Sequence, residues 1–154
     1  MLTGQVNFVV ALRAEAKPVI EYFDMSPLDS CEGFSRFGNT QNGIGLILSG
    51  IGRKNAATAV SHQACETNYA AWINLGTVAH CSLPAGEPRI AHKIHCVSTR
   101  RSWYPPFIFE TPCSTATVRT TDRIPKSFPT DDLYDTEASG FYAAATRFSP
   151  HELI

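Results

Sequence analysis

The sequence has no surplus of positive charge and few charged residues of either sign. Its formal net charge is −1, and only 18% of its residues are charged. Binding to nucleic acid or to an anionic membrane surface depends on a basic patch, so this composition gives neither partner an electrostatic basis. We therefore expect a small-molecule partner, and neither a nucleic acid nor a membrane.

Long apolar runs and closely spaced cysteines are also missing. No run is long enough to span a bilayer, and Met1–Gln5 lacks the basic start of a secretory leader. The five cysteines are scattered without a C-x-x-C pair, which is typical of reduced thiols in a reducing compartment. His92 and His95 would point to opposite faces of a strand. The sequence thus predicts a cytoplasmic protein with no metal and no cofactor.

Apolar runs alternate with helical patterns along most of the chain. The expected strands are Val6–Leu12, Phe34–Phe37, Gly43–Leu48, Ala70–Leu75, Ile90–Ser98 and Thr115–Thr121. The expected helices are Arg13–Phe23, an alanine-rich helix that starts after the polar pair Arg53 and Lys54 and runs to about Cys65, and Tyr134–Arg147. This alternation predicts an α/β fold, a three-layer sandwich with a central mixed twisted sheet flanked by helices. We expect residues 1–154 to form a single domain.

The stretch Leu46–Val60 combines a short apolar strand, a glycine turn and an alanine-rich helix. In the turn, Ser49-Gly50-Ile51-Gly52, the glycines allow a sharp bend and leave backbone N–H groups uncovered. Such a turn at the carboxyl end of a strand is where open α/β sheets hold small ligands, anions especially. A tight connection without a ligand is an equally good interpretation of the local pattern alone.

Polar residues follow three of the expected strands, at Arg13–Glu15, Ser49–Gly52 and Gly76–Thr77. In a mostly parallel sheet these segments share one edge, and Glu137 at the start of the last helix can face the same crevice. Two carboxylates and a hydroxyl suit a ligand rich in hydroxyl groups. The alternative is structural: the carboxylates complement helix N-termini, and Thr77 is a turn residue.

Four motifs in this order resemble the purine nucleoside phosphorylase and nucleosidase superfamily, and within it the methylthioadenosine/S-adenosylhomocysteine nucleosidases most closely. The motifs are Ala11–Glu15, Ser49–Gly52, Asn74–Ala79 and Asp135–Glu137. The resemblance implies a nucleoside phosphorylase-like fold and cleavage of the N-glycosidic bond of a purine nucleoside. It implies no cofactor.

The resemblance also implies roles for particular residues. Glu15 would activate the attacking water, and Glu137 would accept hydrogen bonds from the ribose hydroxyls. The nucleophile, water or phosphate, would lie at Ser49, Gly50, Gly52, Gly76 and Thr77, and the ribose and base at Asp135, Thr136 and Glu137. Tyr104 is a further candidate for the base or sugar pocket. The aromatic stretch around it, Arg100–Phe109, is an equally good candidate for a subunit contact.

The sequence departs from the family pattern at several places. Leu12 replaces a methionine of the first motif, and the helical insertion that family members usually carry before the Thr115–Thr121 strand is absent or very short. Thr136 replaces a methionine that underlies the ribose in the family. The sequence ends at His151–Ile154, whereas family members continue into a further strand, an S-D segment and a closing helix. The Asp of that S-D segment protonates the purine. We therefore expect a domain that is incomplete at its C-terminal end. Such a domain should bind a nucleoside better than it cleaves one. The open sheet edge favours a homo-oligomer, most simply a dimer. There are two alternatives. One is a phosphorylase that uses Arg53 to hold phosphate, and the other is a catalytically dead nucleoside-binding remnant.

Overall fold

The computed structural model describes residues 5–66 and 70–154, which include all of the expected elements. Most of the Met1–Gln5 prediction lies outside these residues. The strands are β1 Val6–Val10, β2 Ser26–Cys31, β3 Phe34–Asn39, β4 Ile44–Leu48, β5 Ala71–Leu75, β6 Ile90–Cys96, β7 Ser102–Trp103, β8 Thr115–Thr120 and β9 Leu133–Asp135. The helices are α1 Arg13–Tyr22, α2 Arg53–Ala64, α3 Ala138–Ala145 and a 3-10 turn at His151–Leu153. None of the described helices is long and apolar enough to cross a membrane.

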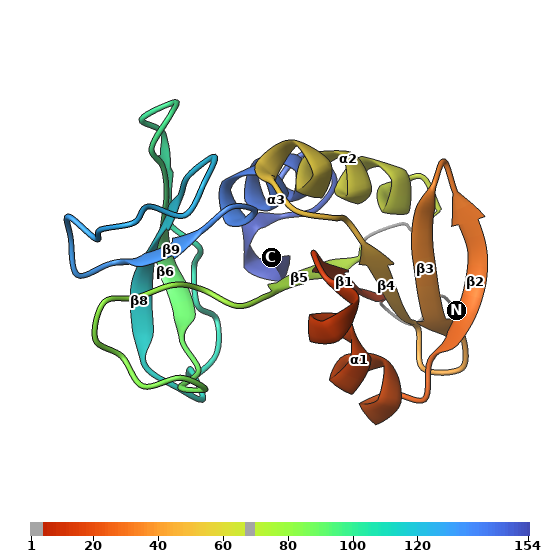
Figure 1. Ribbon diagram of the computed structural model, residues 1–154. Coiled ribbons are helices and arrows are strands. Elements are labelled where there is room, and N and C mark those ends of the chain that lie inside the picture. The colour runs from red at the N-terminus through yellow and green to blue at the C-terminus, as the bar shows by residue number, and fades with distance from the viewer. Residues whose placement is uncertain (1–4, 67–69) are drawn as a thin grey trace.

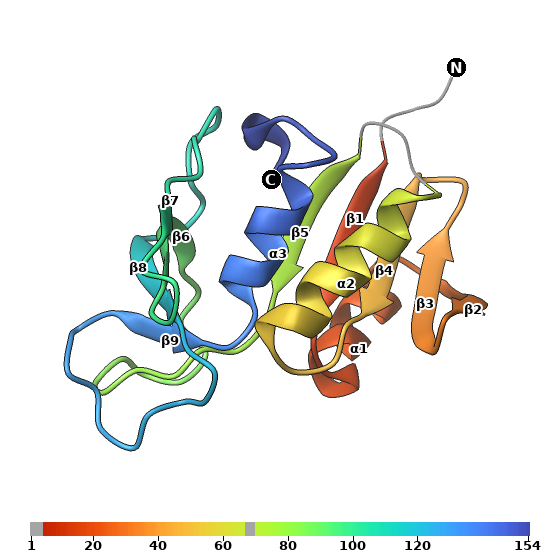
Figure 2. The same ribbon diagram turned by 90° about the horizontal axis from the view of Figure 1, so that it is seen from above.

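The strands form two mixed sheets. The first has the order β2-β3-β4-β1-β5, in which β1 is parallel to both neighbours and the β2–β3–β4 part is antiparallel. Helices α2 and α3 cover one face of this sheet and α1 covers the other (Figure 1). The second sheet has the order β7-β6-β8-β9 and lies across α3 from the first (Figure 2). The predicted α/β fold with mixed sheets flanked by helices is confirmed, although the strands divide between two sheets.

The core fixes α3 between the two sheets. One cluster of buried side chains joins Val9 and Ile47 of the first sheet, Tyr142 of α3, and Ile94 of the second sheet. Trp72 of β5 is 2% exposed, and its indole N–H donates to the Ser149 hydroxyl (3.0 Å), just beyond α3. Helix α3 and the residues just after its C-terminal end are therefore packed against both sheets.

The start of the last helix differs from the sequence prediction. Tyr134 and Asp135 belong to β9, which pairs with β8 in the register Thr120↔Asp135, and α3 begins only at Ala138. The reason is local, because the Asp135 carboxylate accepts hydrogen bonds from the first free amides of the helix and so ends the strand there. The prediction that Asp135 and Glu137 lie inside the first helical turn is wrong.

Strand β2 was not predicted at all. Its sequence contains Pro27 and Asp29, both poor strand formers. Tertiary pairing overrides this preference: β2 runs antiparallel to β3 with Pro27 opposite Phe37 and Leu28 opposite Arg36. The predicted hairpin of β3 and β4 is present beside it.

Candidate active site

Three strands end at the same edge of the first sheet, as the sequence predicts. Val10, the last residue of β1, lies opposite Leu48 of β4 on one side and Leu75 of β5 on the other. The segments that follow these strands therefore leave the sheet side by side. They carry Glu15, the glycine turn and Thr77.

Glu15 lies in the first turn of α1 and joins this helix to the segment after β5. Its Oε1 atom accepts hydrogen bonds from the Thr77 N–H (2.9 Å) and the Thr77 hydroxyl (2.7 Å). Its Oε2 atom accepts from the Leu12 N–H at 3.1 Å, so the carboxylate also caps its own helix. The structural and the catalytic interpretations of Glu15 are thus compatible, and the half-buried carboxylate has a fixed orientation beside Thr77.

The turn after β4 has the backbone geometry that its glycines predict. Gly50 and Gly52 have φ angles of +75° and +105°, which side-chain-bearing residues rarely adopt. The Ser49 and Gly50 N–H groups donate to the carbonyls of Val10, which ends β1, and of Ala11, and the Ser49 hydroxyl donates to the Gly50 carbonyl (2.8 Å). The Ser49 side chain therefore shapes the turn.

Glu137 closes the turn from the side of α3. The Gly52 N–H donates to Glu137 Oε1 at 2.7 Å, and the Thr136 hydroxyl donates to the same oxygen. Among the described residues, Glu137 Oε2 accepts no hydrogen bond, which leaves one carboxylate oxygen available for a ligand. Neighbouring strands lie about 4.8 Å apart, and β1 lies between β4 and β5. The segments that follow β4 and β5, which carry Gly52 and Thr77, therefore begin about 10 Å apart.

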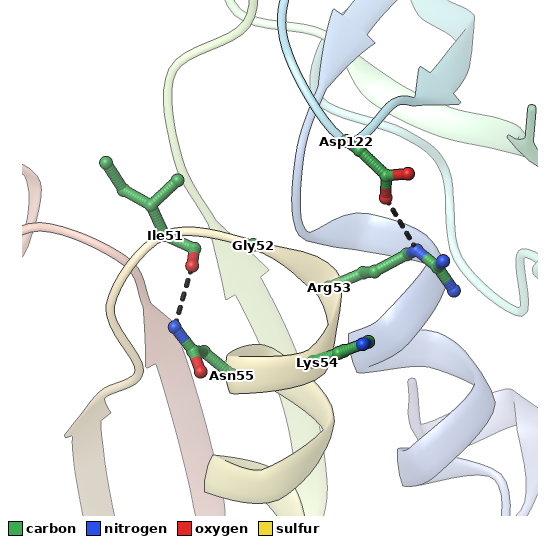
Figure 3. A pocket seen from close by; sticks show the side chains of 6 residues that line it. All are labelled: Ile51, Gly52, Arg53, Lys54, Asn55 and Asp122. Carbon is green, nitrogen blue, oxygen red and sulfur yellow. Dashed lines mark hydrogen bonds and ion pairs between the residues drawn. The ribbon is translucent and has the colours of Figure 1, made fainter. Parts of the chain in front are cut away.

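A hollow of about 250 Å³ opens beside Gly52. It is lined by Ile51, Gly52, Arg53, Lys54, Asn55 and Asp122 (Figure 3). The Arg53 guanidinium in this hollow is paired with Asp122, with 3.1 Å between Nε and Oδ1. Arg53 is therefore a poorer candidate for holding phosphate than its position in the sequence suggests.

The Asp135 carboxylate is buried and makes its hydrogen bonds within the protein. It is 6% exposed, its Oδ1 accepts from the Thr120 hydroxyl (2.7 Å), and its Oδ2 accepts from the N–H groups of Glu137 (3.0 Å) and Ala138 (2.5 Å). Burial raises the pKa of Asp135 to about 6, and the charge of Glu137 acts in the same direction, although the three hydrogen bonds oppose the rise. The sequence did not predict this use of both oxygens.

Tyr104 is not brought to the other candidates. It follows β7, the edge strand of the second sheet, is 66% exposed, and has the Lys93 ammonium 5.7 Å from its ring centroid. In the described ranges no hydrogen bond or ring contact joins it to Glu15, Glu137 or the glycine turn. Ile108 and Phe109 nearby are also exposed. The prediction of an oligomer contact there stays a prediction.

His80, Cys81 and Asp131 form the one group of potential metal ligands that the described residues contain. Its hydrogen bonds do not suit a metal. His80 Nδ1 accepts from the N–H groups of Ser82 and Leu83 (both 3.0 Å), so the ring proton is on Nε2, which faces Asp131 at 3.1 Å. A metal on Nε2 would move that proton to Nδ1, against two donors. His92 and His95 have separate partners, Thr115 and Ser102.

Two mixed sheets, with α1 on one face of the first and α2 and α3 on the other, form an α/β fold of the nucleoside phosphorylase-like type. Solved structures show this directly. A methylthioadenosine nucleosidase from Arabidopsis thaliana, in its apo form, matches with a TM-score of 0.76 and 18% identity, over 94% of this chain and 76% of that chain. No protein-family model and no curated protein matches the sequence.

Two further structures agree. The 5'-methylthioadenosine/S-adenosylhomocysteine nucleosidase of Neisseria meningitidis, in complex with methylthio-immucillin-A, gives a TM-score of 0.73 at 17% identity, over 94% of this chain and 80% of that chain. A futalosine hydrolase mutant of Helicobacter pylori gives 0.71 at 14% identity, over 95% and 84%. At these identities the likeness shows the fold alone. The similarity in fold to these nucleosidases, which the resemblance of the four motifs implies, is confirmed.

Proposed function

We propose that the edge shared by β1, β4 and β5 binds a purine nucleoside and hydrolyses its N-glycosidic bond. One observation carries the proposal. Two carboxylates from distant parts of the chain are fixed at this edge, Glu15 on Thr77 and Glu137 on Gly52. Structures of similar fold contain methylthio-immucillin-A in one nucleosidase and 8-aminoadenine in another, which supports a ligand of this class.

In the proposed complex Glu137 holds the sugar. Its Oε2 atom accepts from a ribose hydroxyl while Oε1 stays on the Gly52 N–H. Glu15 and the Thr77 hydroxyl, already 2.7 Å apart, orient the water that attacks the anomeric carbon, and Glu15 takes the proton that this water loses. The base leaves with the electron pair of the broken C–N bond and takes up a proton from solvent. As the bond to the base breaks, positive charge grows on the sugar, and two fixed carboxylates stabilise it more than they stabilise the neutral nucleoside.

Hydrolysis is favoured over phosphorolysis by the charges at this edge. Glu15 is held beside Thr77, where an incoming phosphate would meet a like charge. The guanidinium of Arg53, the cation closest in sequence to the glycine turn, is paired with Asp122. The edge is therefore acidic at the point where the nucleophile arrives, and this suits neutral water better than phosphate.

The test is the release of free base. The protein is incubated with methylthioadenosine, adenosylhomocysteine or inosine, with and without phosphate, and the base is separated and quantified. We expect release from at least one nucleoside at a rate that phosphate does not change. Release only with phosphate would show a phosphorylase, and calorimetric binding without release would show a binding domain. If none of the three nucleosides is bound and none releases its base, the proposal is refuted.

A further inference from the structure

We propose that Asp135, together with Thr120, is a positioning residue that holds Glu137 in its ligand-binding orientation through the first amides of α3. This inference rests on the proposed function only in what Glu137 binds. The coupling between Asp135 and Glu137 is a property of the fold, and it can be measured without a nucleoside.

The two side chains hold three successive amides at the start of α3. Asp135 Oδ2 accepts from the N–H groups of Glu137 and Ala138, and Thr120 Oγ1 accepts from the Ser139 N–H at 3.0 Å. The Thr120 hydroxyl in turn donates to Asp135 Oδ1 at 2.7 Å. Amides at a helix start have no partner within the helix, so these acceptors fix where α3 begins.

Fixing this start places the Glu137 side chain. Glu137 is the residue before the first residue of α3, and its own N–H is one of the three bonds to Asp135. Its carboxylate then reaches across to the Gly52 N–H at 2.7 Å. If the hydrogen bonds to Asp135 loosen, Glu137 loses its backbone anchor and its side chain no longer holds Gly52.

Only the ionised carboxylate can serve all of these donors, because each oxygen accepts and neither carries a proton. The charged and titratable side chains on the surrounding elements include Glu137, Cys96 at the end of β6, Arg119 of β8, Tyr134 of β9, Tyr142 of α3, and the Arg53–Asp122 pair. Burial raises the pKa of the Cys96 thiol, but hydrogen bonds from neighbouring hydroxyl groups outweigh this and lower it to about 7. Asp135 titrates lower, with a pKa of about 6, so the two steps can be separated by mutation.

The direct test follows backbone amide shifts by NMR as the pH is lowered. Gly52 is the reporter, because its N–H donates to Glu137 and not to Asp135. We expect the Gly52 and Ala138 amides of the wild type to shift with a common midpoint near that of Asp135. In Asp135→Asn, which keeps the size and an acceptor oxygen, both steps should disappear, while any step from Cys96 remains. A Gly52 amide that is unchanged through this pH range, or that keeps its midpoint in Asp135→Asn, would overturn the inference.

Nucleoside affinity and stability give a second readout that a merely structural role would not produce. A carboxylate whose pKa is raised in the folded state costs stability when ionised, so this cost is present above about pH 6 and is lost as the pH falls toward about 4. The urea midpoint of the wild type should therefore rise as the pH falls below about 6 while its affinity for methylthioadenosine falls, and Asp135→Asn should lose both of these opposite changes. A structural role predicts that stability and affinity fall together, and that result would count against positioning.

The two proposals fail in different ways. With about a tenth of Asp135 ionised one pH unit below its pKa, the apparent Kd of the wild type for methylthioadenosine should rise about tenfold there. If no nucleoside binds at any pH but the Gly52 amide still follows Asp135, the proposed function is wrong and the positioning role stands. If nucleosides bind and the Gly52 amide does not follow Asp135, the positioning role is wrong and the proposed function stands.

Discussion

Replacing Glu15 by glutamine is expected to lower the rate of base release by about 10²–10⁴-fold, the usual contribution of a positioned general base. Glutamine keeps the length of the side chain, and its amide oxygen can still accept from the Thr77 N–H that Glu15 Oε1 now binds at 2.9 Å. The fold and the binding of nucleoside should therefore be kept while water activation is lost. The measurement is base release from methylthioadenosine, with its dissociation constant determined separately.

Glu21→Gln is the matched control for this experiment. Glu21 lies on the same helix, pairs with Lys17 on the exposed surface at 3.7 Å, and takes no part in the crevice. Its loss should change neither rate nor affinity. Equal rates for Glu15→Gln and the wild type would show that Glu15 only caps its helix.

Replacing Gly140 by alanine is expected to destabilise the protein by about 3 kcal/mol, the upper part of the range for overpacking. A methyl group at this position would lie 1.9 Å from the carbonyl oxygen of Arg53 and 2.8 Å from its Cα, so α3 and α2 would have to separate. For a chain of this size the melting temperature should fall by about 6–12 °C. Helix propensity alone predicts the opposite sign, because alanine is favoured over glycine within a helix.

Gly76→Ala is the control, since a methyl group there meets nothing closer than Glu15 Oε1 at 3.7 Å and the backbone needs no left-handed φ. Its melting temperature should stay close to that of the wild type. Because the Gly140 contact also sets the distance between Gly52 and Glu137, Gly140→Ala should weaken nucleoside binding at temperatures where it is still folded. An unchanged melting temperature for Gly140→Ala would contradict the close approach of the two helices.

The elements that the sequence predicts well are those with strong local patterns. Strands β1 and β5 are nearly continuous apolar runs, and α2 follows a glycine turn with an alanine-rich segment. Strand β2 and the boundary between β9 and α3 escaped prediction because both depend on partners distant in sequence. Local propensity in Ser26–Cys31 argues against a strand, and only β3 makes it one.

The site shows the same division. Sequence order alone placed Glu15, the glycine turn and Thr77 at one edge, because strands that alternate with helices are parallel. It did not predict that Glu15 binds Thr77 across 62 positions or that Glu137 binds Gly52 across 85. Nor did it predict that Asp135 uses both oxygens within the protein, since a carboxylate at a helix start looks the same in sequence whether it faces a ligand or an amide.

The most direct test of the account is a methylthioadenosine titration of Glu15→Gln, in which the nucleoside persists, followed at the Thr77 and Gly52 amides by NMR. These two N–H groups report on the residue at position 15 and on Glu137, respectively. The account predicts that both resonances shift with a single dissociation constant, because one ligand lies between them. A shift at only one of them, or two different dissociation constants, would show that the two carboxylates do not share a site.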